Sequence, residues 1–223
     1  MPRIARVVAP GMPHHITQRG NRRLQTFFSD QDYSTYIDLM QEWCDFYGVD
    51  IWSYCLMPNH VHMIAVPSSK SSLKSAIGEA HRRYSRMINF REGWKGHLWQ
   101  GRFASYVLDN NYLLACARYI EMNPVRAGLV NDPKAWQWSS AKAHIDGIND
   151  KLVKTEPLIK IVKKNWVDFL SESISSKERN LLQTHERTGR PLGRTEFIKK
   201  LEKTLGLKLK LKKPGRKSKK RNC

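Results

Sequence analysis

His60 and His62 are the residues whose type and spacing first suggest chemistry. Only Val61 separates them, within an apolar run between Pro58 and Pro67. Alternate side chains of a β-strand point to the same face, so a strand here would place both imidazoles side by side. Two imidazoles on one face supply half of a metal site. The alternative is one core histidine and one surface histidine, and for an isolated His-x-His pair this alternative is favoured.

Tyr119 and Asn123 are four residues apart in a predicted helix, so they share a face. Tyr112 lies seven residues before Tyr119, and both could instead be core residues. A phenol is a poor nucleophile at neutral pH because its pKa is about 10. It needs a site that favours the phenolate and a phosphate polarised by a cation. The two histidines and the amide oxygen of Asn123 could hold that cation, with positions left for phosphate oxygens.

The charge of the chain indicates a polyanionic partner. Lys and Arg number 39 against 20 Asp and Glu, a net charge of +19. Nucleic acid is the first candidate and an anionic membrane the alternative. No stretch approaches the roughly 20 apolar residues of a spanning helix, and no signal peptide is evident, which predicts a cytoplasmic protein. The four cysteines form no C-x-x-C pair, so neither a disulfide framework nor a zinc ribbon is indicated.

Arginines and lysines are the candidate contacts to nucleic-acid phosphates. A basic strip of His81, Arg82, Arg83 and Arg86 is predicted on one helix, where a solvated face is the equal alternative. The candidates in the first part of the chain are Arg19, Arg22, Arg23, Arg82, Arg83, Arg102 and Arg126. Those in the basic C-terminal tail are Lys208, Lys210, Lys212, Lys213, Arg216 and Lys217.

Hydrophobic periodicity predicts an α+β fold. Strands are expected at residues 13–20, 49–56, 60–66 and 104–108, and helices at residues 31–47, 73–90 and 112–123. The order strand, helix, strand, strand, helix, strand, helix matches a ferredoxin-like antiparallel sheet with one helix added.

The sequence changes character near Gly147. We expect residues 1–147 to form a first domain, which contains both histidines and Tyr119, and residues 148–223 to form a helical and basic DNA-binding extension. In that extension, residues 171–190 are polar and expected to be loosely packed, and residues 195–205 have the pattern of a short helix ending at Gly206. The tail, residues 208–223, contains no acidic residue and is expected to be flexible.

Three motifs resemble those of REP-associated tyrosine transposases, which belong to the HUH single-tyrosine transposases related to those of small single-strand insertion sequences. The motifs are Met57–His62, Trp99–Phe103 and Arg118–Val130. The resemblance covers roughly residues 10–147. It implies a ferredoxin-like domain that nicks and rejoins single-stranded DNA.

The resemblance also assigns roles to residues. The two family histidines that bind the divalent metal correspond to His60 and His62, and the nucleophile corresponds to Tyr119. The third ligand of the wider family is a glutamine four residues after the tyrosine, where this chain has Asn123. Mg²⁺ or Mn²⁺ is implied as the metal, although two imidazoles alone would suit zinc better.

The implied reaction begins when a hairpin of repeated palindromic DNA docks on basic side chains. Tyr119 then attacks the phosphate of the adjacent single strand, which gives a 5′-phosphotyrosine and a free 3′-hydroxyl. One alternative is a DNA-binding protein that descends from a transposase and has no catalysis. Another is a His-x-His hydrolase that uses activated water. A monomer and a homodimer are equally compatible with the sequence.

Overall fold

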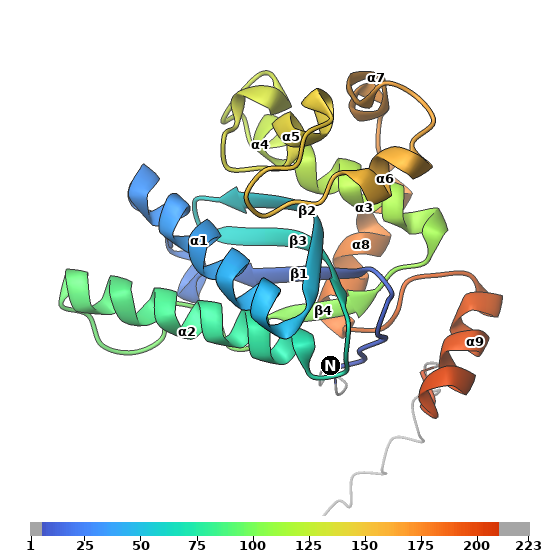
Figure 1. Cartoon of the computed structure of the whole chain (residues 1–223), viewed down its shortest axis with the longest axis horizontal. Helices are drawn as coiled ribbons and strands as arrows, with labels where there is room; N and C mark the ends of the chain where they lie inside the picture. The colour runs from blue at the N-terminus through green and yellow to red at the C-terminus, as the bar shows by residue number, and fades with distance from the viewer. Residues whose placement is uncertain (1–5, 210–223) are drawn as a thin grey trace, which may run out of the picture.

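A four-stranded antiparallel sheet is the centre of the fold (Figure 1). The structure is a computed structural model that describes residues 6–209. The strands are β1 (His14–Arg19), β2 (Val49–Met57), β3 (His60–Pro67) and β4 (Ala104–Val107). Their order across the sheet is β2-β3-β1-β4, and each neighbouring pair is antiparallel. The predicted α+β class is confirmed, while the ferredoxin-like assignment stays a prediction.

Helices α1 (Asp30–Tyr47) and α2 (Ser72–Glu92) cover one face of the sheet (Figure 1). The Ser29 hydroxyl accepts a hydrogen bond from the backbone of Asp32, whose carboxylate bonds back to the Ser29 amide, so a capping box starts α1 at the predicted place. Gly48 ends α1 in the left-handed conformation, with φ of 64°. The main core cluster lies between these two helices and the sheet.

The opposite face of the sheet is covered by α3 (Asn110–Glu121) and α8 (Ser176–Thr188). Asp109 caps α3 by accepting from the backbone amides of the first turn. The structure ends α3 at Glu121, and Asn123 begins a separate short helix, α4 (Asn123–Arg126), with Pro124 in its first turn. The prediction of a single helix over residues 112–123 is therefore wrong at its C-terminal end.

Helix α8 corrects the expectation that residues 171–190 pack loosely. It starts with a capping box between Ser175 and Glu178, and the side chain of Leu182 is 1% exposed. The Tyr106 hydroxyl on β4 donates a hydrogen bond to the Leu182 carbonyl oxygen, 3.1 Å away. This helix therefore packs against the second face of the sheet.

The remaining helices connect or follow these elements. They are η1 (Asn21–Arg23), η2 (Pro133–Ala135), α5 (Ala141–Asp146), α6 (Glu156–Ile161), α7 (Trp166–Ser171) and α9 (Thr195–Leu205). The short helix predicted over residues 195–205 corresponds to α9, which packs Leu201 against Val7 and Val107.

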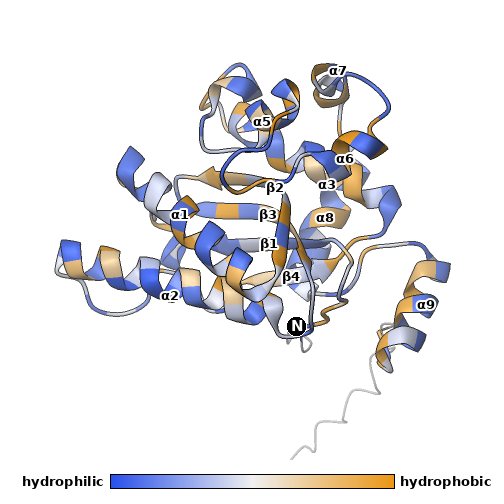
Figure 2. Ribbon diagram, viewed as in Figure 1, coloured by the Kyte–Doolittle hydropathy of each residue, from blue (hydrophilic) through white to orange (hydrophobic). Residues whose placement is uncertain are grey.

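Figure 2 shows helices that alternate between hydrophobic and hydrophilic residues, as expected of elements with one buried side. Among residues 6–209, no helix has the length and apolar character needed to cross a bilayer. The division at residue 147 stays a prediction. Bridges from Val153 to Ile51 and from Leu192 to Leu108 connect the later part of the chain to the sheet region.

Candidate active site

The strand register places the predicted metal ligands on the face of the sheet that α3 covers. On β3, His60 is paired with Arg19 of β1, and His62 is paired with Thr17. Paired residues of antiparallel strands point to the same face, and so do residues two apart. The two imidazole rings lie 5.0 Å apart between centroids. His62 is buried, at 2% exposure, and His60 is half-buried.

Tyr119 reaches this face from α3. Its ring centroid lies 5.6 Å from that of His62 and 6.3 Å from that of His15, in edge-to-face arrangements. The Tyr119 side chain is buried, at 7% exposure. The fold thus brings the phenol of Tyr119 together with the imidazoles of His62 and His15, which are far apart in the sequence.

The phenol of Tyr119 is under opposing electrostatic influences. Burial raises its pKa, while the positive charge of Arg126 and a side-chain hydrogen bond with Gln183 of α8 lower it. The guanidinium carbon of Arg126 lies 4.1 Å from the centre of the Tyr119 ring. In the free protein the phenol is therefore protonated at neutral pH, next to a cation that favours the phenolate.

Both histidines of β3 are neutral at physiological pH. Burial lowers the pKa of His60 to about 4, and the nearby charges of Arg19 and Arg126 act in the same direction. Burial, with smaller contributions from neighbouring histidines and arginines, lowers the pKa of His62 well below its usual value. Only a neutral imidazole has a nitrogen lone pair to donate to a metal.

The tautomer of His60 follows from its contact with Asn59. The Asn59 amide nitrogen donates to the Arg23 carbonyl oxygen at 2.9 Å, which identifies the other amide atom as oxygen. That oxygen lies 2.6 Å from Nδ1 of His60 and can only accept. Nδ1 therefore carries the proton, and Nε2 of His60 carries the lone pair.

Asn123 is linked to Tyr119 through Arg126, which contacts both residues, so its amide oxygen already has a partner. The guanidinium of Arg126 donates to Oδ1 of Asn123, while Nδ2 is buried without a hydrogen-bond partner among the described residues. Within residues 6–209, no group of three or more His, Cys, Asp or Glu side chains could hold a metal ion. The donors that the structure brings together are thus two neutral imidazoles, while ligation by the Asn123 oxygen stays a prediction. Two imidazoles on one face can hold a divalent cation that keeps open coordination positions.

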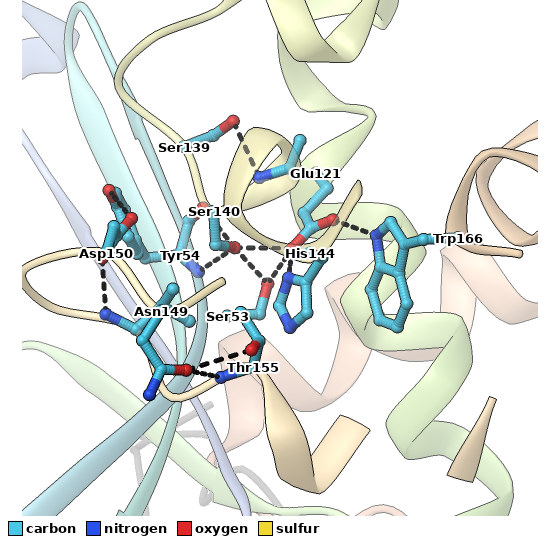
Figure 3. A network of polar contacts seen from close by, with 12 residues as sticks. Ser53, Tyr54, Glu121, Ser139, Ser140, His144, Asn149, Asp150, Thr155 and Trp166 are labelled. Carbon is cyan, nitrogen blue, oxygen red and sulfur yellow. Dashed lines mark hydrogen bonds and ion pairs between the residues drawn. The ribbon is translucent and has the colours of Figure 1, made fainter. Parts of the chain in front are cut away.

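A buried polar network supports the end of α3 that follows Tyr119 (Figure 3). Glu121 is fully buried, and one carboxylate oxygen accepts from the Ser140 hydroxyl at 2.5 Å and from Nδ1 of His144 at 2.7 Å. Its other oxygen accepts from the Trp166 indole at 2.8 Å. These bonds connect α3 to α5 and α7, and so restrict the position of Tyr119.

The predicted DNA contacts lie in different environments. Arg19 is half-buried beside His60, Arg126 lies on Tyr119, and Arg22, Arg23 and Arg102 are exposed. Arg22 and Arg23 have left-handed backbones, with φ of 53° and 63°. Lys208 is exposed, whereas Lys210, Lys212, Lys213, Arg216 and Lys217 lie outside the described residues.

The predicted basic strip on α2 differs from the structure at one position. Arg82 and Arg83 are exposed and both pair with Glu79, on the helix layer that covers the opposite face of the sheet from Tyr119. His81 is buried, accepts from or donates to the Tyr36 hydroxyl at 2.8 Å, and stacks on Trp99. Burial lowers its pKa to about 3, so His81 is a neutral core residue and adds no charge to the strip.

Three residues of this cluster were not recognised in the sequence: His15, Tyr106 and Gln183. His15 lies 3.0 Å from His62 and 2.7 Å from the Tyr106 hydroxyl, measured between the hydrogen-bonding atoms. His15 and Thr17 alternate along a predicted strand, a signal that could have identified His15. Tyr106 and Gln183 carry no comparable local signal, since long-range contacts bring them to the site.

Comparison with known proteins assigns the chain to a family. A family model described as Transposase IS200 like matches residues 9–123. This is more than half of the 223 residues, and the chain belongs to the IS200-like transposase family. The resemblance predicted from the three motifs is therefore confirmed. Helix α8 lies beyond the matched residues.

Individual relatives are more distant. The chain is 25% identical over 108 residues to a Haemophilus influenzae protein assigned as a REP-associated tyrosine transposase. This alignment covers 44% of the chain and 61% of that relative. The solved structure of a REP-associated tyrosine transposase bound to a REP hairpin superimposes with a TM-score of 0.57 at 20% identity. It covers 69% of this chain and 92% of that one, and shows a shared fold.

Proposed function

We propose that this protein cleaves and rejoins single-stranded DNA beside palindromic hairpins through a 5′-phosphotyrosine intermediate, with Tyr119 as nucleophile. The observation that carries the proposal is the contact of the Tyr119 ring with His62, at 5.6 Å between centroids, beneath the guanidinium of Arg126. A nucleophile, a set of metal donors and a fixed positive charge are the components that a tyrosine-based phosphoryl transfer requires.

Each component has a role in the reaction. His60, His62 and the Asn123 oxygen would hold Mg²⁺ or Mn²⁺, and the cation when bound polarises the scissile phosphate and stabilises the leaving oxygen. The charge of Arg126 and the hydrogen bond from Gln183 favour the phenolate of Tyr119. The Tyr119 oxygen forms a bond to phosphorus as the bond from phosphorus to the 3′ oxygen breaks. The proton lost by the phenol is balanced by the one gained by the new 3′-hydroxyl.

Rejoining is the reverse reaction, in which a 3′-hydroxyl attacks the phosphotyrosine and releases Tyr119. The number of bonds is conserved, so no external energy source is needed. The hairpin as the partner is supported by the net charge of +19 and by the fold shared with the hairpin-bound transposase. A DNA substrate of this kind agrees with the cytoplasmic location expected from the sequence.

A covalent-adduct assay tests the proposal. The protein is incubated with Mn²⁺ and 3′-end-labelled DNA that carries a repeat hairpin and its flanking single strand, because the 3′-terminal fragment is the one that stays on the protein. The products are separated on a denaturing gel. A labelled protein band that disappears in Tyr119→Phe supports the proposal. Tyr112→Phe is the matched control, because Tyr112 lies on the same helix and is only half-buried, and it should keep the adduct.

The two alternatives give different results in the same assay. Tight hairpin binding without any adduct indicates a DNA-binding protein that has no catalysis. Cleavage that survives Tyr119→Phe and leaves no DNA on the protein indicates a hydrolase that uses water.

A further inference from the structure

A chain of three hydrogen bonds runs from α8 to the metal-binding face of the sheet. The Tyr106 hydroxyl contacts the Leu182 carbonyl oxygen at 3.1 Å and Nδ1 of His15 at 2.7 Å. Nε2 of His15 then contacts Nδ1 of His62 at 3.0 Å. Leu182, Tyr106, His15 and His62 are all buried. The chain of bonds is therefore shielded from water that could exchange with its members.

The direction of each bond follows from its first member. A carbonyl oxygen can only accept, so the single proton of the Tyr106 hydroxyl is committed to Leu182. The Tyr106 oxygen must then accept the proton carried by Nδ1 of His15. A fully buried imidazole that contacts no carboxylate is neutral, because burial of an unpaired charge is costly. Nε2 of His15 is consequently an acceptor, and Nδ1 of His62 is the donor.

The ring geometry supports this bond. The rings of His15 and His62 are within 17° of parallel, and their centroids are 5.2 Å apart. The separation is close to the 3.0 Å nitrogen–nitrogen distance plus the two ring radii, so the rings meet edge to edge and are not stacked face to face. The Nδ1–H bond of His62 thus points in the ring plane toward the lone pair of His15.

We infer that Tyr106 and His15 act as positioning residues, which hold His62 in the tautomer that leaves the Nε2 lone pair free for a metal. The inference rests on the proposed function for the identity of the metal site. Metal-binding histidines generally donate their other ring N–H to a neighbouring group, and that contact determines tautomer and ring orientation. Here the neighbouring group is a second histidine, and the chain of bonds ends on the backbone of α8.

Helix α8 consequently acts on both halves of the site. The carbonyl of Leu182 orients the bonds that end at His62, and the adjacent residue, Gln183, hydrogen-bonds the phenol of Tyr119. Residues 176–188 lie outside the 9–123 segment that matches the transposase family. The active site of this chain therefore includes an element beyond the family match.

Nitrogen NMR of the free protein tests the tautomer directly, with neither metal nor DNA present. In protein labelled with ¹⁵N-histidine, the ring signals of His62, assigned by their loss in His62→Gln, should show the Nδ1–H tautomer. In Tyr106→Phe the hydroxyl is removed, and we expect signals of both tautomers. An unchanged Nδ1–H pattern in Tyr106→Phe overturns the inference.

Metal affinity gives a second readout. Mn²⁺ binding to the DNA-free protein, followed by electron paramagnetic resonance, should weaken about 10-fold in Tyr106→Phe. Tyr36→Phe is the matched control, because Tyr36 is also a buried tyrosine whose hydroxyl hydrogen-bonds a buried histidine, but on the other face of the sheet. It should lose similar stability and keep the wild-type affinity for Mn²⁺.

The outcomes separate this inference from the proposed function. Equal Mn²⁺ affinity in the wild type and Tyr106→Phe, or equal weakening in Tyr106→Phe and Tyr36→Phe, overturns the positioning role and leaves the phosphotyrosine proposal intact. An adduct that still forms in Tyr119→Phe contradicts the proposed function, whichever tautomer His62 has. If Tyr106→Phe does not fold, His15→Leu is measured against His15→Gln, whose amide oxygen can still accept from His62. Weaker Mn²⁺ binding in His15→Leu alone supports the inference, and equal affinities overturn it.

Discussion

Arg126 lies directly over the ring of Tyr119, with its guanidinium carbon 4.1 Å from the ring centre. The same guanidinium donates to the amide oxygen of Asn123 and, at 3.2 Å, to the backbone carbonyl of Tyr119. The sequence predicted Arg126 only as a contact to DNA phosphate. The contact to DNA stays a prediction, and under the proposed function the position of Arg126 also gives it a role in favouring the phenolate of Tyr119.

Replacement of Arg126 by glutamine should slow adduct formation about 100-fold, the typical cost of removing one group that stabilises developing charge. Burial raises the pKa of Tyr119 and the charge of Arg126 opposes that effect, so Arg126→Gln should raise the pKa further. The midpoint of the pH–rate profile should then move to higher pH. Both quantities are measured as rates of adduct formation across a pH series.

Arg82→Gln is the control for Arg126→Gln. Arg82 is exposed, pairs with Glu79 and lies across the sheet from Tyr119, so its loss should change neither the rate nor the pH midpoint. If Arg126→Gln weakens hairpin affinity as much as it slows the reaction and leaves the midpoint unchanged, Arg126 is a DNA contact after all.

His60→Ala should abolish nicking while leaving hairpin affinity within about twofold of the wild type. His60 is half-buried at the start of β3, and its loss removes a proposed metal donor without opening a large cavity. Nicking is measured with labelled hairpin DNA and Mn²⁺, and affinity by fluorescence anisotropy in the presence of a chelator. A parallel loss of both would show that His60 is a structural residue.

Acid should destabilise the fold through its buried neutral histidines. Burial lowers the pKa of His81 to about 3 from a usual value of 6.5, so between these values the unfolded chain binds a proton that the folded chain does not. Stability therefore falls as pH drops below about 6.5, and His81 alone accounts for about 2 kcal/mol between pH 7 and pH 5. His81→Gln should reduce the pH dependence of unfolding in urea by that amount.

His97→Gln is the control for this measurement, since it also replaces one imidazole by an amide but at an exposed position. An equal pH dependence in wild type and His81→Gln would mean that the buried imidazole is not the source of acid sensitivity. The absolute stability of His81→Gln at pH 7 is a separate quantity and does not affect the comparison.

Removal of residues 210–223 should weaken hairpin affinity and flatten its dependence on salt. The deleted segment contains eight lysines and arginines and no acidic residue. For each DNA phosphate that the shortened protein no longer neutralises, the slope of log affinity against log salt should become shallower by about 0.7 to 0.9. Anisotropy titrations at several salt concentrations give the slope, and an unchanged slope would exclude a DNA-binding role for the tail.

The truncated protein should keep Leu209 as its last residue. Leu209 is buried, its amide donates to Glu202 at 2.6 Å, and its carbonyl accepts from Arg190. Deleting Leu209 as well would mix a loss of stability with a loss of DNA affinity. Thermal unfolding of the truncated protein should therefore match that of the full chain.

The sequence was most informative where a candidate functional residue lies in an element with a clear strand or helix periodicity. His60 and His62 are two residues apart on a strand, and Tyr119 lies in a helix expected from hydrophobic periodicity, so strand alternation and helical period were enough to predict their elements. His15 and Tyr106 become partners only through the pairing of β1 with β4. No local pattern encodes that pairing, and the hydrogen-bond chain was therefore not predicted.

At His81, the residue type suggested an exposed charge, whereas the helical spacing correctly indicated a buried side chain. His81 lies four residues after Ile77 and three before Tyr84, within the apolar stripe of α2, yet it was grouped with the neighbouring arginines because it can carry charge. Helix α8 was missed for the opposite reason. Few of its residues are apolar, and Leu182 alone is fully buried, so tertiary contact decides its packing.

Helix α8 is synthesised later than the other residues of the site, because it follows them in the sequence. The motif histidines and Tyr119 leave the ribosome well before residues 176–188, which supply the Leu182 carbonyl and Gln183. Under the proposed function, a nascent chain, or a fragment that stops where the family match ends, has Tyr119 and both imidazoles but lacks the groups of α8 that orient them. On that proposal, nuclease competence requires synthesis of the chain through α8, well beyond the histidines and Tyr119 themselves.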